Sequence, residues 1–300
     1  MVVQTKGRVL SNREIESGYF LLDIECEPIA GLAVPGQFVM IKASDDDHPL
    51  LRRPFSLYRS YPISHSEKKR GGQLSILYKR IGAGTLKMTE FKEEQAVDLI
   101  GPLGKGYTPP PLPSRRGSAG PVSVRQCRHD SRSGSSRLLT TSASLILIGG
   151  GIGIVSLAFL AERLKPANLF VFIGGKKSHD ILCLEDFKKL HAHLFIATED
   201  GSLGFNGTII DLFFSQLERF KKSEPHYLYS CGPMEMLKRL ARRIEPGRFV
   251  CQASLEARMA CGFGACWGCV VKTTHPQTPY QRVCKEGPVF PLESIAWDAE

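Results

Sequence analysis

Four cysteines near the C-terminal end constrain the fold of this chain more than any other feature. Cys261, Cys266, Cys269 and Cys284 follow the spacing C-x4-C-x2-C-x14-C, which is the plant-type pattern for a [2Fe–2S] cluster held by four thiolates. Three ligands must then come from one tight loop, while the fourth returns to it from a separate segment. We therefore expect a small lobe around this loop, in a protein that transfers single electrons.

The composition around the loop favours a cluster over zinc or disulfides. Gly262, Gly264 and Gly268 remove the side chains that would obstruct a loop wrapped around an anionic cluster. Zinc sites usually contain two separated C-x2-C pairs. The N-terminus has no apolar leader, and nine cysteines in such a chain indicate a reducing compartment, the cytoplasm. The other cysteines show no ligand spacing and are expected mostly in the core: Cys26, Cys127, Cys183, Cys231 and Cys251.

The positive charge is concentrated in one segment. The chain has a net charge of +9, of which residues 109–141 carry +5 through six arginines and one acid, Asp130. This Pro/Ser/Arg-rich segment has almost no aromatic residue to stack on bases, so we interpret it as a disordered insert or linker and expect no nucleic-acid partner. The chain is 42% hydrophobic and 23% charged, as is usual for a globular protein.

Residues 1–108 are expected to form a β-barrel. Their short β-rich runs are separated by turn signals such as Pro35-Gly36-Gln37. A short helix is expected from Thr85, with Thr85 as its N-cap. The expected strands are 7–10, 19–24, 38–42, 74–79 and 97–100.

Residues 142–253 change to alternating strands and helices, which predicts a doubly wound α/β domain with a mostly parallel sheet. The apolar run 145–161 is short and interrupted by glycines, so it predicts a strand, a turn and a helix rather than a membrane span. Residues 254–300 then form the [2Fe–2S] lobe beyond the last strand. The expected strands are 145–148, 168–173, 194–198, 227–230 and 249–253, and the expected helices are 154–164, 184–190, 208–220 and 234–244.

Two motifs in the barrel could bind a phosphate-bearing cofactor. The motif Arg53-Pro54-Phe55-Ser56 lies on an expected strand, where the arginine offers a bidentate fork to a pyrophosphate. Gly82 and Gly84 precede Thr85 at a helix start and would allow a phosphate close to the backbone N–H groups. A structural glycine turn is the alternative for the second motif.

Two motifs in the α/β domain could bind a nicotinamide nucleotide. Gly149, Gly150, Gly151 and Gly153 follow a buried strand and open a helix, which is the context that a dinucleotide phosphate site requires. The pair Cys231-Gly232 ends a later strand, where small residues would let a flat nicotinamide approach. A buried cysteine before a helix that begins near Pro233 is the alternative.

These motifs together resemble the ferredoxin-NADP reductase superfamily, in which a β-barrel binds FAD and an α/β domain binds the nicotinamide cofactor. The C-terminal region is more specific and resembles the electron-transfer subunits of dihydroorotate dehydrogenase B. The resemblance covers almost the whole chain except 109–141. Its most specific parts are the segments 254–262, 266–272 and 282–290.

The resemblance implies the cofactors and the partner. The cysteines would hold the [2Fe–2S] cluster, and a separate FMN subunit would oxidise dihydroorotate in pyrimidine biosynthesis. The two kinds of subunit would form a heterotetramer. Electrons would pass by way of the cluster and FAD to NAD+, so no general acid or base is assigned in this chain. The FAD contacts implied by the resemblance are Arg53, Pro54, Phe55, Ser56, Leu77, Tyr78, Lys79, Gly84 and Thr85.

Two other functions remain open from the sequence. One is the small FAD and [2Fe–2S] subunit of a bifurcating ferredoxin–NADP reductase or a sulfide dehydrogenase, for which Lys176 and Lys177 give slight support through a possible 2′-phosphate contact. The other is a zinc-containing nucleic-acid-binding protein, suggested by the net charge. The all-cysteine ligand set and the ending Cys284-Lys285-Glu286-Gly287-Pro288-Val289-Phe290 favour the dehydrogenase subunit.

Overall fold

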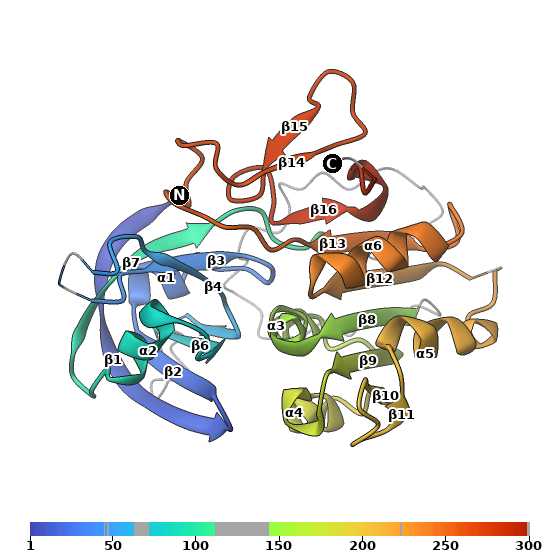
Figure 1. Cartoon of the computed structure of the whole chain (residues 1–300), viewed down its shortest axis with the longest axis horizontal. Helices are drawn as coiled ribbons and strands as arrows, with labels where there is room; N and C mark the ends of the chain where they lie inside the picture. The colour runs from blue at the N-terminus through green and yellow to red at the C-terminus, as the bar shows by residue number, and fades with distance from the viewer. Residues whose placement is uncertain (45, 47, 63–71, 112–143, 223, 299–300) are drawn as a thin grey trace, which may run out of the picture.

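The computed structural model describes residues 1–44, 46, 48–62, 72–111, 144–222 and 224–298. Nearly all of the Arg-rich segment 109–141 lies outside the described residues, and its interpretation as an insert or linker stays a prediction. The described residues form two seven-stranded sheets and a C-terminal lobe, residues 255–298, that contacts both (Figure 1).

The N-terminal sheet is antiparallel and curled, as in a half-barrel, which confirms the barrel type of fold predicted for residues 1–108. Its inward side chains, such as Leu22, Ile24 and Leu99, are fully buried. Two short helices, α1 (Glu27–Ala30) and α2 (Ala83–Thr89), lie in its connections. In order across the sheet the strands are β4 (Arg53–Ser56), β3 (Phe38–Ile41), β7 (Ala96–Leu103), β1 (Val3–Glu16), β2 (Tyr19–Glu25), β6 (Gln73–Lys79) and β5 (Arg59–Tyr61).

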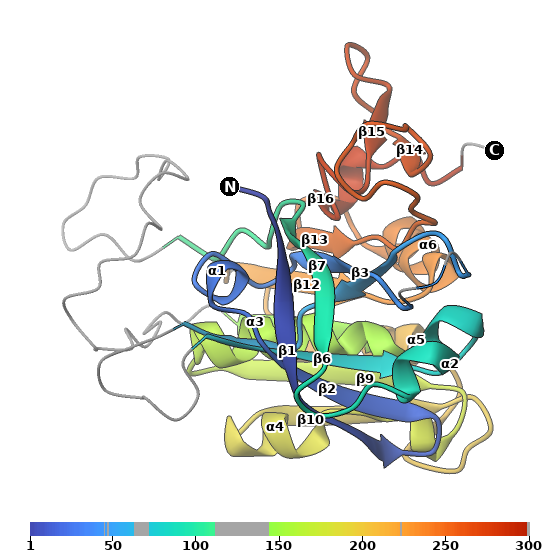
Figure 2. The same cartoon turned by 90° about the vertical axis from the view of Figure 1, so that its left-hand side faces the viewer.

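The second sheet is parallel except at one edge and is covered by four α-helices: α3 (Ile154–Leu164), α4 (Leu184–Lys189), α5 (Ile209–Ser215) and α6 (Met234–Arg243). Figure 2 views the molecule from the N-terminal sheet, with the second sheet and its helices behind. Across the second sheet the strands are β11 (Phe205–Asn206), β10 (His193–Thr198), β9 (Leu169–Gly175), β8 (Ser144–Gly150), β12 (His226–Cys231), β13 (Val250–Ser254) and β16 (Val289–Pro291).

Both faces of the second sheet are buried, because alternate residues of its strands pack in opposite directions. Ile146 and Ile148 of β8 pack in the core that contains residues of α5 and α6. Leu145 and Leu147 pack in the core that contains residues of α3 and α4. The neighbouring strands β8 and β12 are thus followed by helices on opposite faces, which creates the crevice where doubly wound folds bind nucleotides.

The helix predicted over 208–220 is shorter in the structure. Thr208 is the N-cap of α5, and its hydroxyl accepts a hydrogen bond from the Asp211 backbone N–H at 3.3 Å. The helix ends at Ser215, and a 3₁₀ turn follows at Leu217–Arg219. This change of direction places Phe220 in the core, with its ring centroid 5.0 Å from that of Phe170.

The C-terminal lobe is less separate from the α/β domain than the sequence predicts. Strand β13 was expected to close the series, but β16 pairs with it antiparallel, with Ser254 opposite Val289. Only the hairpin β14 (Val270–Lys272) and β15 (Tyr280–Arg282) belongs to the lobe alone. Three residues of β16 are too few to produce a recognisable period in the sequence.

No helix in the described ranges is both long and apolar enough to cross a membrane. The apolar run 145–161 forms β8, the Gly151–Gly153 turn and the first part of α3, as predicted.

Candidate functional site

The loop with the first three cysteines is shaped by residues in the left-handed backbone region. Gly262 and Gly264 have φ values of 78° and 91°, and Trp267 has a φ of 58°. A Cβ atom on Gly262 would lie 2.5 Å from Cγ of Met40 on β3. Glycine is therefore required at 262 both for the turn and for the close packing of the loop on the N-terminal sheet.

The four cysteines of the predicted ligand set lie close to one another. The Cys266 side chain acts on the Cys261 thiol and lowers its pKa. The Cys269 thiol interacts with that of Cys284 and also accepts a hydrogen bond from the Cys284 backbone N–H at 3.4 Å. A [2Fe–2S] cluster requires two thiolates on each iron, and this pairing brings one ligand pair from the loop alone and a second from the loop and the returning segment.

Backbone N–H groups of the loop point at the first thiol. Burial acts to raise the pKa of Cys261, but hydrogen bonds from the backbone of Cys266, Phe263 and Ala265 lower that pKa to about 6. The pKa of Cys284 is raised to about 12 by burial and by the adjacent Cys269 thiol. A bound cation is needed to hold the buried Cys284 side chain as a thiolate. The N–H donors around the Cys261 sulfur are typical of iron–sulfur loops.

Within the described residues, no three His, Cys, Asp or Glu side chains converge on a point that could hold a single metal ion. A structural zinc site would require four ligands around one ion. The spacing of the four cysteines, three of them in one loop, is the plant-type pattern of a [2Fe–2S] cluster rather than the two separated pairs usual for zinc.

Arg282 and Glu286 are two residues of this site that sequence reasoning missed. Arg282 donates from Nη1 to the Gly264 carbonyl at 2.7 Å and from Nη2 to Glu286 Oε1 at 2.6 Å. Its guanidinium carbon lies 4.4 Å from the centroid of the Trp267 ring. The hydrogen bond with Arg282 lowers the pKa of Glu286 to about 2. The i, i+4 spacing of an arginine and a glutamate beside Cys284 was the signal available in the sequence.

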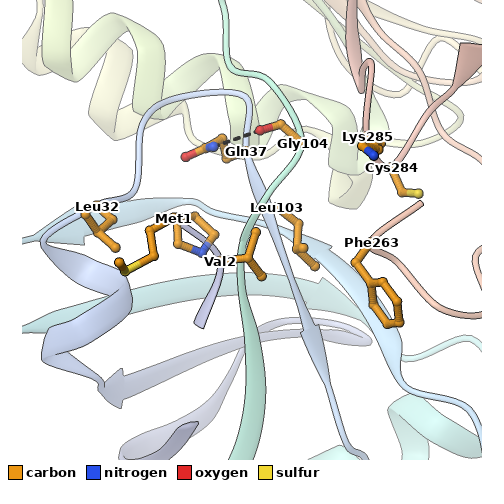
Figure 3. A pocket seen from close by; sticks show the side chains of 10 residues that line it. Met1, Val2, Leu32, Gln37, Leu103, Gly104, Phe263, Cys284 and Lys285 are labelled. Carbon is orange, nitrogen blue, oxygen red and sulfur yellow. Dashed lines mark hydrogen bonds between the residues drawn. The ribbon is translucent and has the colours of Figure 1, made fainter. Parts of the chain in front are cut away.

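A pocket of about 300 Å³ lies beside the fourth cysteine (Figure 3). On one side it is lined by Phe263, Cys284 and Lys285 of the lobe, and on the other by the N-terminal residues and the end of β7. Phe263 is 50% exposed. An accessible surface with an exposed aromatic side chain therefore adjoins Cys284. The remaining lining residues are Met1, Val2, Leu32, Gln37, Pro102, Leu103 and Gly104.

The structure brings together the two motifs of the N-terminal sheet. A Cβ atom on Gly84 would lie 2.8 Å from Nε of Arg53, so the arginine side chain lies against the start of α2. Arg53, Pro54 and Phe55 are half-buried on β4, and Ser56 is exposed. A guanidinium next to a helix start can bind a phosphate group.

Thr85 is not the N-cap that the sequence predicted. The helix α2 begins two residues earlier, with Gly82 as its N-cap. The Thr85 hydroxyl accepts hydrogen bonds from the backbone N–H groups of Ile81 at 2.9 Å and Gly82 at 3.1 Å. The prediction was wrong because a threonine within the first turn can reach back to the same N–H groups that an N-cap residue would leave exposed.

The remaining predicted flavin contacts on β6 differ in accessibility. Leu77 and Tyr78 are buried, and the Tyr78 ring packs edge-on against Phe55 with centroids 5.9 Å apart. Lys79 is half-buried, and its Nζ lies 2.9 Å from Oδ1 of Asp180.

Asp180 was not identified from the sequence, yet it connects the two sheets. It is 6% exposed and follows β9 of the second sheet. Tyr19 of β2 donates a hydrogen bond to its Oδ1 at 2.5 Å. Burial would raise the pKa of Asp180, but the hydrogen bonds from Tyr19 and Lys79 lower it to about 2. A single aspartate in a turn carries no sequence signal of such a contact.

The predicted nicotinamide residues meet at the carboxyl ends of β8 and β12. Cβ atoms built on these glycines would collide with the opposite loop: that of Gly153 would lie 2.5 Å from the Cys231 carbonyl oxygen, and that of Gly232 3.0 Å from the Gly150 nitrogen. Gly149 packs closely against the first residue of α3, and Gly151 has a φ of 51°. The glycines therefore let the two loops pack against each other at the switch point.

Cys231 is buried at this position, and burial raises its pKa to about 11. The residue is therefore a neutral thiol at physiological pH, with Ser156, Ser254 and Tyr107 within hydrogen-bonding reach. A neutral, small side chain can contact an apolar ring face without adding charge.

Comparison with known proteins agrees with this geometry. Residues 256–296 match the family model described as the iron-sulfur cluster binding domain of dihydroorotate dehydrogenase B. The curated electron transfer subunit of dihydroorotate dehydrogenase B (NAD(+)) from Geobacillus thermodenitrificans is 35% identical over 292 residues, covering 97% of each chain. The corresponding protein from Desulforamulus reducens is 32% identical and covers 97% of this chain and 98% of its own.

The chain belongs to the electron transfer subunits of dihydroorotate dehydrogenase B. This membership confirms the resemblance inferred from the sequence and favours it over the two alternative functions.

Solved structures support the fold of this electron transfer subunit. The structure of an NADH-dependent reduced ferredoxin-NADP oxidoreductase aligns with a TM-score of 0.73 and 22% identity, covering 97% of this chain and 90% of that one. A ferredoxin reductase in carbazole 1,9a-dioxygenase aligns with a TM-score of 0.58 and 18% identity, covering 83% and 69%. At these identities the likeness shows the ferredoxin reductase-like fold alone.

Proposed function

We propose that this chain transfers electrons from an FMN-containing subunit that oxidises dihydroorotate to NAD+ in pyrimidine biosynthesis, with FAD and a [2Fe–2S] cluster as its redox groups. The observation that carries this proposal is the approach of Cys284 to the three-cysteine loop, which packs on β3, in a chain of this family. When bound, the cluster supplies one-electron transfer and the flavin supplies hydride exchange with the nicotinamide.

The site residues are assigned on the geometry described above. We assign Cys261 and Cys266 to one iron and Cys269 and Cys284 to the other, because their side chains interact in these pairs. FAD is assigned to the surface where the Arg53–Ser56 strand meets α2, with Lys79 at its edge. The nicotinamide nucleotide is assigned to the loops after β8 and β12.

The domain division follows from the same assignment. The N-terminal sheet, residues 1–108, holds the flavin, and residues 142–253 hold the nucleotide. Residues 254–300 hold the cluster. Residues 109–141 connect the first two domains and carry no cofactor ligand in this proposal.

The partner subunit is expected to dock beside the fourth cysteine. Electron transfer between subunits requires the cluster to lie near the interface, and the exposed Phe263 adjoins the pocket next to Cys284. Exposed apolar groups of this kind are typical of interface anchors. We expect two such chains to assemble with two catalytic subunits. The use of free thiols as ligands favours the cytoplasm, where thiols stay reduced.

Co-expression with the catalytic subunit tests the proposal. The purified complex should show flavin and iron–sulfur absorption and should reduce NAD+ when dihydroorotate is added. The same preparation of the catalytic subunit alone should not reduce NAD+. A complex that is loaded with all cofactors and lacks this activity would contradict the proposed function.

A further inference from the structure

Arg282 contacts the three-cysteine loop at two places. Its Nη1 donates to the carbonyl of Gly264, which lies between the first and second cysteines, at 2.7 Å. Its guanidinium carbon lies 4.4 Å from the centroid of the Trp267 ring, which lies between the second and third cysteines. Arg282 itself ends β15, two residues before Cys284. One side chain therefore joins the loop to the segment that brings the fourth cysteine.

Glu286 fixes the orientation of this guanidinium. Arg282 Nε lies 3.0 Å from Glu286 Oε2, and Nη2 lies 2.6 Å from Oε1. The backbone N–H of Arg282 also donates to Oε2 at 2.8 Å. This two-pronged contact leaves Nη1 directed at the loop carbonyl, which a single-point lysine could not reproduce together with the ring contact.

A solvent-exposed ion pair would explain little, because such pairs contribute about 0–1 kcal/mol and are screened by salt. The Arg282 and Glu286 side chains are only 15% and 27% exposed. Arg282 interacts electrostatically with the Cys269 and Cys284 thiols, and Glu286 lies two residues after Cys284. A change of charge at either residue therefore changes the energy of a charge added at the sulfurs.

We propose that Arg282 is a positioning residue for the cluster loop and that the Arg282–Glu286 ion pair sets the reduction potential of the cluster. The proposal rests on the [2Fe–2S] assignment in the proposed function. In the intact pair the two charges largely cancel. Removing either one leaves the other uncompensated beside the thiolates, and net charge near a cluster shifts its potential.

The two members of the pair should therefore have opposite effects. Arg282→Gln leaves a carboxylate that disfavours the added electron, so the potential falls. Glu286→Gln leaves a guanidinium that favours the added electron, so the potential rises. If the substitutions only loosened the loop, the reduction potential would not shift in opposite directions in the two variants.

The experiment is a redox titration of the complex with its catalytic subunit, in which the reduced cluster is followed by its electron paramagnetic resonance signal. Lys272→Gln is the matched control, because Lys272 is an exposed cation of the same lobe on β14. We expect its potential to equal that of the unmodified complex. Shifts of the same sign in Arg282→Gln and Glu286→Gln, or no shift in either, would overturn the electrostatic part of the proposal.

Arg282→Lys tests the positioning part, since it keeps the charge and loses the planar fork. We expect it to lose iron to excess EDTA several-fold faster than the unmodified complex and the Lys272→Gln control. Loss of iron at the unmodified rate would overturn the positioning role. If Arg282→Gln retains no cluster, the loss itself supports positioning, and the rise expected in Glu286→Gln still decides the electrostatic part. An unmodified complex without iron would instead contradict the proposed function.

Discussion

Tyr19 and Asp180 join the two sheets through a hydrogen bond of 2.5 Å between the phenol oxygen and Oδ1. Lys79 of the N-terminal sheet binds the same carboxylate oxygen at 2.9 Å. A second contact is made nearby, where Arg59 pairs with Asp186 and lies 3.3 Å from Glu162. Both contacts cross between the N-terminal sheet and the α/β part of the chain, so they set how these two parts meet beside the proposed flavin surface.

Asp180→Asn is expected to weaken the domain contact. The variant leaves the hydrogen-bond donors of Tyr19 and Lys79 without their charged acceptor, which should lower the free energy of unfolding by about 1–2 kcal/mol. Thermal unfolding of the complex checks this. Glu185→Gln removes an exposed pair with Lys188 on α4 and is the control. Equal melting temperatures for Asp180→Asn and the unmodified chain would contradict the expectation.

The contribution of Asp180 should depend on pH with a defined sign. Its pKa in the folded chain is about 2, below the ordinary value of 3.8, so the stabilisation is complete above the unfolded pKa and is lost as pH falls toward 2. The difference in melting temperature between the unmodified chain and Asp180→Asn should be constant from pH 7 to about 5 and should narrow below about 4. A difference that grows on acidification would show that another group is responsible.

Cys266→Ser is expected to remove the iron–sulfur absorption and leave the flavin absorption. The hydroxyl replaces one of the two donors to an iron, and serine is a poor substitute for a thiolate at a soft metal site. Iron analysis and the visible spectrum of the purified complex check this. Cys251→Ala is the control, since Cys251 is buried in β13 and is not one of the four proposed ligands. Full iron content in Cys266→Ser would remove that residue from the ligand set.

Arg53→Ala should weaken FAD binding about 10- to 100-fold, as expected for the loss of a charged hydrogen bond to a phosphate. Gly84→Ala should weaken FAD binding less. Its methyl group would lie 2.8 Å from Nε of Arg53, and this flexible side chain can move aside while keeping its charge. Titration of flavin fluorescence with the apoprotein measures both. Arg80→Ala, at an exposed neighbouring position, should bind FAD as the unmodified chain does. A larger loss of FAD binding in Arg80→Ala than in Arg53→Ala would contradict the assignment of the phosphate site to Arg53.

Gly153→Ala should impair the nucleotide site. Its methyl group would lie 2.5 Å from the backbone carbonyl oxygen of Cys231, which cannot move aside as a side chain can. We expect a loss of about 1–3 kcal/mol in stability, typical of overpacking, together with weaker NADH binding. Gly31→Ala is the control, since its nearest neighbour would be at 3.5 Å. Calorimetric titration with NADH should distinguish the two variants.

Periodic patterns explain why much of the fold could be predicted. The buried strand β8 and the helix α3 were placed by an apolar run with a glycine turn, and α3 has the bounds expected from the sequence. The cysteine spacing likewise predicted the cluster lobe, whose family is confirmed. Such features depend on local chain geometry, so a single sequence is sufficient to find them.

Contacts between distant residues could not be predicted in this way. Asp180 and Tyr19 are far apart in the sequence, and nothing near either residue indicates the other. The error at Thr85 had a different cause, because a threonine near a helix start can act as the N-cap or can lie in the first turn and accept from N–H groups before it, as Thr85 does. Strand β16 was missed because its register on β13 depends on tertiary pairing.

The pairing of β16 with β13 joins the C-terminal lobe to the second sheet. Free energy released when a metal binds its ligands is also folding free energy, so we expect cluster binding in the lobe to stabilise β13 at the edge of that sheet. Iron starvation should then increase local opening at β13, observable as faster amide hydrogen exchange. The lobe could not be excised as an autonomous ferredoxin without leaving an unprotected sheet edge behind.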